Sequence, residues 1–159
     1  MTDVAAREAL IAPHRRTGRL SGRCLCGDVR IEVDGNYVAA IGACHCVMCQ
    51  RWNGMLFGSF VADTKAVTVA GPVSSFASSS FSERGFCTTC GSAIWLRATD
   101  PEEPEIELFP GSFKEAADFV LLSEIYADLA PDYACLSGDH RRRTRAEVQA
   151  QHPFVEGDN

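Results

Sequence analysis

The placement of cysteine constrains this chain more than any other feature of its sequence. Seven of the eight cysteines fall into three short clusters, which read Cys24-Leu25-Cys26-Gly27, Cys44-His45-Cys46-Val47-Met48-Cys49 and Cys87-Thr88-Thr89-Cys90-Gly91. Two cysteines with one or two residues between them can bring their sulfurs to a common ion, from one face of a strand or from one tight turn. The sequence therefore predicts seven metal-ligating cysteines. The isolated Cys135 is expected to be a small, buried apolar side chain.

Two of the clusters look like matching halves of one closed metal site. Cys24 and Cys26 would lie on the same face of an extended strand, whereas Cys87 and Cys90 have the spacing of a metal-binding turn. A glycine follows each pair directly, and glycine takes the positive φ that such turns often require. We therefore predict a tetrahedral four-thiolate zinc site of the structural kind.

The middle cluster combines both spacings within six residues, and no glycine follows its last cysteine. Three thiolates close together predict a zinc ion with its fourth position open, which is typical of a catalytic site. The ligands of this second zinc would be Cys44, Cys46 and Cys49.

Other arrangements of the ligands stay open at this point. The triad could be a second structural site completed by His45 or Cys135, although an extended backbone would turn His45 to the opposite face. The first cysteine pair could also join the triad instead of the third cluster. A redox pair at Cys87 and Cys90 is disfavoured, because redox motifs usually begin a helix within a βαβ pattern and no such pattern is found here.

Composition and charge favour metal over disulfides. The 159 residues suit one domain, and a net charge of −6 argues against non-specific binding to nucleic acid or to an anionic membrane. No apolar segment approaches the length of a membrane span, which is about 20 residues. Residues 4–12 do not form a signal peptide, since Arg7 and Glu8 interrupt them. We therefore expect a cytoplasmic protein with reduced thiols and with no nucleic-acid or membrane partner.

The chain is expected to consist of an N-terminal extension at 1–16, a zinc-binding domain at 17–135 and a polar, basic tail at 136–159. The basic run in the tail, His140 to Arg145, is interpreted as the solvated face of a helix. Helical turns are predicted at 5–10, 113–119 and 144–151. Apolar, β-branched segments predict strands at 29–33, 37–43, 56–61, 66–70, 92–97 and 106–109, with an edge strand or loop at 76–81.

Taken together, the ordered motifs Gly22-x-Cys24-x-Cys26-Gly27-x-Val29, Cys44-His45-Cys46-x-x-Cys49 and Phe86-Cys87-x-x-Cys90-Gly91 resemble the glutathione-dependent formaldehyde-activating enzyme family, also called the GFA or CENP-V domain. The resemblance runs from Thr17 to Tyr126. It implies a mainly β, Mss4-like fold of several small antiparallel sheets clamped by zinc, with one or two short helices. It also implies two zinc ions per chain, one structural at Cys24, Cys26, Cys87 and Cys90, and one catalytic at Cys44, Cys46 and Cys49.

The activity that this resemblance implies is a carbon–sulfur lyase reaction that joins or splits glutathione and formaldehyde. Members often carry a histidine where this chain has Glu124, in the stretch Glu124-Ile125-Tyr126. We therefore expect a zinc-dependent lyase whose small-molecule partner is a glutathione-like thiol or its adduct with a small aldehyde. His45 would lie beside the ligands without binding the metal.

Three arginines near the clusters, Arg51, Arg84 and Arg97, are candidates to receive a substrate carboxylate, or else are solvated surface charges. The alternative function is a zinc-stabilised binding module with no catalytic activity. The fourth position of the triad separates the two hypotheses. An exogenous thiol or water there would support the enzyme, whereas His45 or Cys135 there would support the module.

Overall fold

The computed structural model describes residues 3–100, 102 and 104–151. They form two compact units, each assembled from separate parts of the chain. The described residues of 1–13, 40–58 and 120–159 make up the first unit, and residues 14–39 and 59–119 make up the second. Within the described ranges, no helix is long and apolar enough to cross a membrane. The predicted domain limits at residues 17 and 135 stay a prediction.

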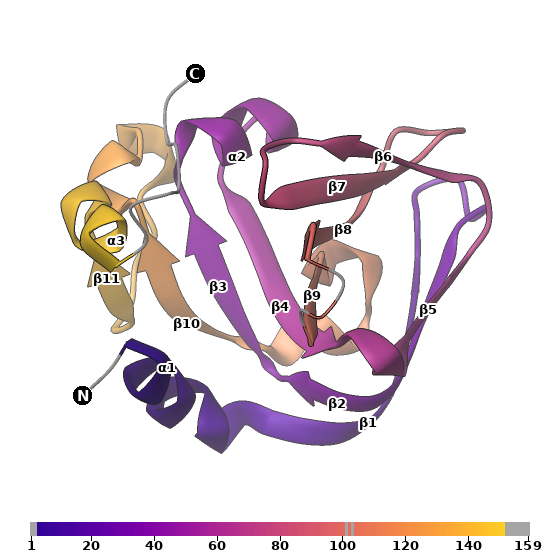
Figure 1. The fold of residues 1–159 in the computed structure, drawn as a ribbon, viewed down its shortest axis with the longest axis horizontal. Helices are drawn as coiled ribbons and strands as arrows, with labels where there is room; N and C mark the ends of the chain where they lie inside the picture. The colour runs from indigo at the N-terminus through magenta and orange to yellow at the C-terminus, as the bar shows by residue number, and fades with distance from the viewer. Residues whose placement is uncertain (1–2, 101, 103, 152–159) are drawn as a thin grey trace. The chain divides into compact units, whose positions relative to one another are not determined.

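The first unit contains three short helices and three parallel strands (Figure 1). Strand β10 pairs in parallel with both of its neighbours, so that Glu124 lies opposite Ala43 on one side and Arg142 on the other. The segment that carries the middle cysteine cluster therefore lies beside a strand that comes about eighty residues later in the chain. The elements of this unit are α1 (Asp3–Ile11), β3 (Ala40–Cys44), α2 (Val47–Asn53), β10 (Val120–Ile125), β11 (Arg141–Arg143) and α3 (Arg145–Gln151).

Helix α2 begins at Val47, shortly after strand β3 ends at Cys44. Cys46 is its N-terminal cap, with extended backbone at φ −61 and ψ 154, and Gly54 ends it in the left-handed conformation at φ 72. A left-handed glycine after the last helical residue is a common helix stop. The sequence analysis predicted no helix here, because seven residues make too short a periodic pattern to be recognised.

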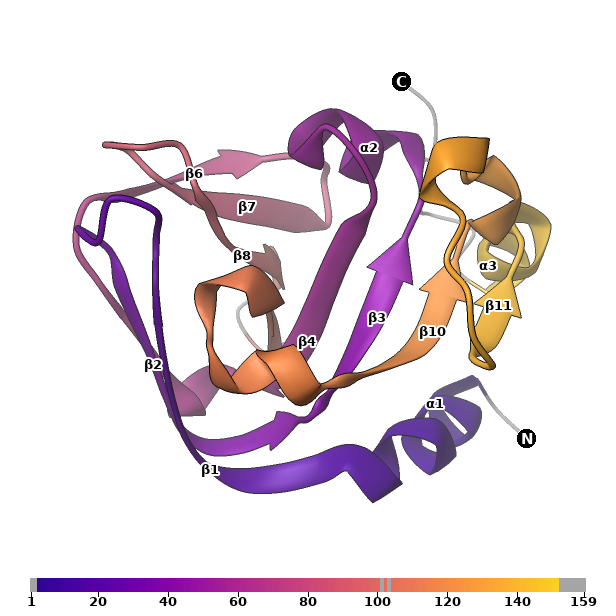
Figure 2. The same cartoon turned by 180° about the vertical axis from the view of Figure 1, so that it is seen from behind.

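The second unit is antiparallel throughout (Figure 2). Two of its strand groups join where Tyr37 pairs with Ala62. One group is β1 (Arg15–Arg23), β2 (Arg30–Val38) and β5 (Val67–Ala70). The other runs in the order β4 (Phe57–Asp63, from Ser59 onward in this unit), β9 (Glu105–Leu108), β8 (Ala93–Ala98), β7 (Ser82–Cys87) and β6 (Val73–Ala77).

Aromatic rings fill the core of the second unit. Phe60 meets Phe113 and Phe119 edge to face, with ring centroids 5.3 and 5.4 Å apart. Gly22 lies against the Phe113 ring so closely that a Cβ atom would come within 2.7 Å of it. Phe113 also pairs through its backbone with Gly22. Strand β1 therefore packs on this aromatic cluster only because residue 22 has no side chain.

The prediction of a mainly β fold is confirmed, and strands lie at or within two residues of most expected positions. Helix α2 and strands such as β10 were not predicted, and three further details differ. The segment predicted as one strand at 37–43 is divided at Ala39 between β2 and β3. The helix expected at 113–119 is only a 3₁₀ turn at Glu115–Asp118, since Phe113 is held in the core. The first unit is parallel, whereas small antiparallel sheets were expected.

Candidate metal centres

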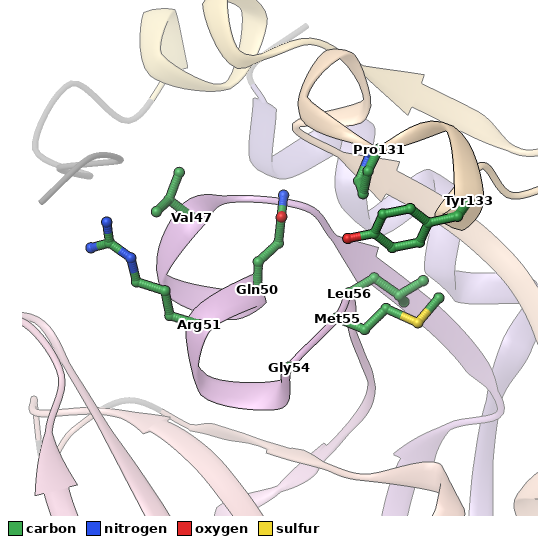
Figure 3. A pocket seen from close by; sticks show the side chains of 8 residues that line it. All are labelled: Val47, Gln50, Arg51, Gly54, Met55, Leu56, Pro131 and Tyr133. Carbon is green, nitrogen blue, oxygen red and sulfur yellow. The ribbon is translucent and has the colours of Figure 1, made fainter.

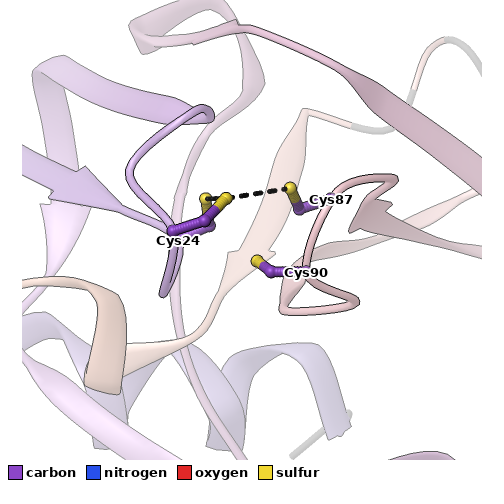
Figure 4. A group of neighbouring side chains, drawn as sticks. Cys24, Cys87 and Cys90 are labelled. Atoms are coloured by element: carbon purple, nitrogen blue, oxygen red, sulfur yellow. Dashed lines mark hydrogen bonds between the residues drawn. The ribbon is translucent and has the colours of Figure 1, made fainter.

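The second unit brings together Cys24, Cys26, Cys87 and Cys90, as predicted. Their four sulfurs all lie within 4.8 Å of one another. Figure 4 shows Cys24 facing Cys87 and Cys90. The Sγ atom of Cys26 lies 3.4 Å from that of Cys24 and 3.8 Å from that of Cys87. Four thiolates at about 2.3 Å from one tetrahedral ion would stand about 3.8 Å apart. The arrangement therefore fits a single metal ion bound by four sulfurs.

The two glycines that follow the cysteine pairs have the role expected of them. Gly27 has φ 87 and Gly91 has φ 75, and each donates its N–H to the carbonyl of the first cysteine in its turn. No atom lies within 4 Å of where a Cβ would stand at either position. Glycine is therefore required by the left-handed backbone and not by lack of space.

The thiol groups of this cluster have opposite tendencies to ionise. The Ser92 hydroxyl and backbone N–H donate to the sulfur of Cys90 and lower its pKa to about 5. At Cys26 the Asp28 N–H lowers the pKa, but desolvation and the neighbouring sulfurs outweigh it and raise the pKa to about 12. Four thiols this close cannot all ionise without a cation between them. A divalent metal would make all four ionised forms favourable and would release protons on binding.

The first unit brings together the other predicted group, Cys44, Cys46 and Cys49. Cys44 ends β3, Cys46 caps α2, and Cys49 lies in the first turn of that helix. All three are buried, and their sulfurs lie within 4.8 Å of one another. Hydrogen bonds with the other two sulfurs, and then burial, raise the pKa of Cys44 far above its usual range. A metal ion here would again displace protons.

His45 lies outside this sulfur group, although it stands between two of its members. Its N–H donates to the Ile125 carbonyl at 3.1 Å, and its own carbonyl accepts from Gln50 Nε2 at 2.6 Å. The ring is fully buried, with Nε2 at 2.8 Å from Glu124 Oε1 but outside hydrogen-bond angles. His45 is not grouped with the three sulfurs as a potential ligand.

Glu124 is a buried carboxylate that the sequence analysis did not identify as a functional residue. It is 2% exposed, and His140 Nε2 lies 2.7 Å and Arg142 Nε 3.2 Å from its Oε2 atom. Burial raises the pKa of Glu124, but the hydrogen bond from His140 and the attraction of His45 outweigh burial and lower it. Two signals were available: a glutamate within the apolar stretch Val-Leu-Leu-Ser-Glu-Ile, and its place where members of the similar family often carry a histidine.

The interpretation of the basic run as a solvated helix face is wrong. The His140 side chain is 1% exposed, and the three following arginines form strand β11, while a helix begins only at Arg145. The reason is that a buried carboxylate must be paired. The run therefore supplies Glu124 with its partners.

A pocket of about 290 Å³ lies over helix α2 (Figure 3). Tyr133, which is 79% exposed, reaches over Leu56 and Met55 on one side of it. Among the residues that the structure describes, the lining contains one cationic side chain, Arg51, and no acidic one. Gln50 belongs to the lining and also donates to the carbonyl of His45. The pocket and the sulfur triad therefore share one helix. The lining residues are Val47, Gln50, Arg51, Gly54, Met55, Leu56, Pro131 and Tyr133.

The remaining sequence candidates lie elsewhere. Arg84 is buried in β7 and is therefore not a solvated charge, whereas Arg97 is exposed, stacks on Trp95 at 4.5 Å and pairs with Glu83 at 2.5 Å. The expectation that Cys135 is buried is wrong. It is exposed after a 3₁₀ turn that ends one residue earlier, with its sulfur 3.7 Å from the Pro131 carbonyl.

Several known proteins are similar to this chain. The family described as glutathione-dependent formaldehyde-activating enzyme matches residues 19–128. An uncharacterized lyase of Schizosaccharomyces pombe is 29% identical over 112 residues, which is 70% of this chain and 80% of the yeast protein. A protein of Halomonas elongata, provisionally named a glutathione-dependent formaldehyde-activating enzyme, is 33% identical over 96 residues, which is 55% of this chain and 60% of that protein. A crystal structure of a Rhodobacter sphaeroides protein aligns with a TM-score of 0.47 at 22% identity, over 59% of this chain and 87% of that one.

Proposed function

This chain belongs to the glutathione-dependent formaldehyde-activating enzyme family, and we propose that it is a zinc-dependent carbon–sulfur lyase acting on the adduct of a thiol and a small aldehyde. The observation that carries this proposal is the buried triad of Cys44, Cys46 and Cys49. Three sulfurs placed for one ion, with no fourth protein ligand grouped with them among the described residues, leave a coordination position for a substrate.

Zinc is the metal that best fits both sulfur groups. Tetrahedral sites made of thiolates alone favour zinc or an iron–sulfur cluster. In the four-cysteine group, sulfur distances of 3.4 and 3.8 Å suit a single ion, and the triad sulfurs all lie within 4.8 Å of one another. We therefore propose two zinc ions per chain, one closed by four cysteines and one held by the triad. When bound at the triad, zinc would take a substrate thiol as its thiolate, because soft ligands suit a soft, sulfur-rich site.

The side chains around α2 would hold the rest of the substrate. Arg51 would pair with a carboxylate of the thiol compound. Gln50 would accept a hydrogen bond at its Oε1 atom, because its Nε2 atom already donates to the carbonyls of His45 and Leu129. Met55 and Tyr133 offer apolar surface that would cover the stem of the substrate and exclude water from it. A glutathione-like thiol, with carboxylates some distance from its sulfur, matches such a lining.

The reaction balances without any further reagent. In the joining direction the substrate sulfur forms a bond to the aldehyde carbon, the carbonyl π bond breaks, and the proton of the thiol ends on the new hydroxyl group. In the splitting direction the same bonds change in reverse. The contribution of the protein would be to hold the sulfur and the carbonyl carbon in contact, which lowers the entropic part of the barrier.

The alternative, a binding module with a second structural zinc, has less support. It would need His45 or Cys135 as the fourth ligand of the triad. The ring of His45 faces Glu124, Cys135 is exposed, and neither is grouped with the three sulfurs. The family name and the lyase name of the yeast relative also favour the enzyme.

The test combines metal analysis with an assay of adduct formation. Wild-type protein should contain about two zinc ions and should accelerate the exchange of formaldehyde with a thiol such as glutathione, followed by NMR line shapes. A Cys46→Ser variant should stay folded, lose one zinc and lose the acceleration. Cys135→Ser is the matched control and should behave as wild type. Two zinc ions in wild type with no acceleration for any thiol would support the binding module instead.

A further inference from the structure

His45 is held at each of its polar backbone groups and at its ring. The N–H bonds to Ile125 at the end of β10, and the carbonyl bonds to Gln50 of α2. Gln50 Nε2 lies in addition 3.2 Å from the Leu129 carbonyl. With the ring against Glu124, this residue is fixed from three directions. Because Cys44 and Cys46 flank His45 in the chain, the position of His45 determines where their two sulfurs lie.

The ring contact depends on a segment that lies beyond the family match. That match ends at residue 128, whereas His140 and Arg142 come from the chain around β11. Both contact the Oε2 atom of Glu124 and leave Oε1 for His45. Arg142 also donates to the carbonyls of Leu136 and Gly138, which ties the connection before β11 to the same cluster.

A buried charged cluster of this kind is a weak source of stability. Taking a carboxylate out of water costs several kcal/mol, and apolar replacements of buried ion pairs are often neutral or stabilising. The cluster is therefore better explained by what it orients. Residues that hold metal ligands from behind affect metal affinity by about 10- to 100-fold when they are changed.

We propose that Glu124, held by His140 and Arg142, is a positioning residue that keeps Cys44 and Cys46 in place for the metal by fixing His45. The C-terminal segment of this chain is thus part of its open metal site. The proposal rests on the proposed function only in taking the triad as a metal site, and it requires no lyase activity.

The experiment measures the metal affinity of each sulfur group separately in the zinc-loaded, full-length protein. A chelator competes for zinc, exposed thiols are alkylated, and the alkylation of each cysteine is read by peptide mass spectrometry. Glu124→Gln keeps the shape of the side chain and removes its charge. His140→Phe removes the hydrogen bond and keeps a planar ring, although a larger one, and it serves as the second variant if the first does not fold.

We expect both variants to weaken zinc binding at the triad by about 10- to 100-fold and to leave the four-cysteine group unchanged. Val148→Ala is the matched control for loss of stability, because Val148 is buried in α3 of the same unit and lies outside the cluster. It should lower the melting temperature without changing either affinity. Unchanged triad affinity in Glu124→Gln and His140→Phe would overturn the proposal. So would an equal loss of affinity in Val148→Ala, since the effect would then follow from stability alone.

The lyase assay keeps the two proposals distinct. Suppose that the wild-type protein has no lyase activity and that Glu124→Gln loses zinc from the triad. That outcome would refute the proposed function and support the positioning role. Lyase activity with triad affinity unaffected by Glu124→Gln would do the reverse.

Discussion

Replacing Gly85 by alanine should destabilise the second unit and loosen its four-cysteine group. Gly85 lies in β7 beneath the buried indole of Trp95, its partner across the ladder to β8. A Cβ atom there would meet the ring atoms Cε2, Nε1 and Cδ2, the latter two at 2.5 and 2.6 Å. The indole has little room to move away, because Trp95 is only 7% exposed and the guanidinium of Arg97 stacks on it at 4.5 Å.

Overpacking a filled core typically costs about 1–3 kcal/mol. For a chain of this size each kcal/mol lowers the melting temperature by about 2–4 °C, so we expect a decrease of about 2–12 °C by circular dichroism. Strand β7 continues to Cys87 only two residues later, and the ladder already shifts register between Gly85 and Phe86. Chelator should therefore also remove metal from the four-cysteine group faster than in wild type.

Gly111→Ala provides the matched control in the same unit. Gly111 is exposed, and no atom lies within 4 Å of its would-be Cβ. This variant should melt within about 1 °C of wild type, as expected for a surface substitution. Equal melting temperatures for the two alanine variants would refute the packing argument at Trp95.

Three further predictions concern the triad, the pocket and the core. Hydrogen bonds with neighbouring sulfurs raise the pKa of Cys44, so this thiol must lose a proton when metal binds. The zinc affinity of the triad, measured in competition titrations, should therefore fall as pH falls. Arg51→Gln should raise KM for a carboxylate-bearing thiol by about tenfold with little change in kcat, because it removes one charge-assisted hydrogen bond. The control Arg19→Gln, at the exposed pair with Asp34, should change neither KM nor kcat. Phe60→Ala should lower the free energy of unfolding by about 3–5 kcal/mol in denaturant titrations, because it removes a buried ring between Phe113 and Phe119.

The two cysteine pairs and the triad were predictable because their signals are local. Each pair or triad lies within six residues, and the left-handed turns at Gly27 and Gly91 follow from residue type alone. The strands of the second unit could be found for a similar reason, since alternation of apolar residues, as at Ile31 and Val33, depends only on neighbours in sequence.

The features that sequence analysis missed depend on contacts between distant segments. Strand β10 is defined by parallel pairing with β3, and no local pattern shows which strands will meet. Glu124 finds His140 sixteen residues later, so the basic run looked like a solvated surface. Helix α2 has only seven residues, and a helix so short is stable only through its tertiary contacts.

The four-cysteine group and the triad differ in how much chain they enclose. Cys26 and Cys87, whose sulfurs lie 3.8 Å apart, are separated by 61 positions in the sequence, whereas the triad closes a loop of only a few residues. An ion that joins ends so distant acts as a cross-link on the unfolded chain, and a loop of that length corresponds to about 4 kcal/mol of conformational entropy. The ion at the triad would restrict the unfolded chain far less. With metal bound, the closed group would therefore cross-link the fold, and the triad could exchange its metal or ligand at little cost to folding.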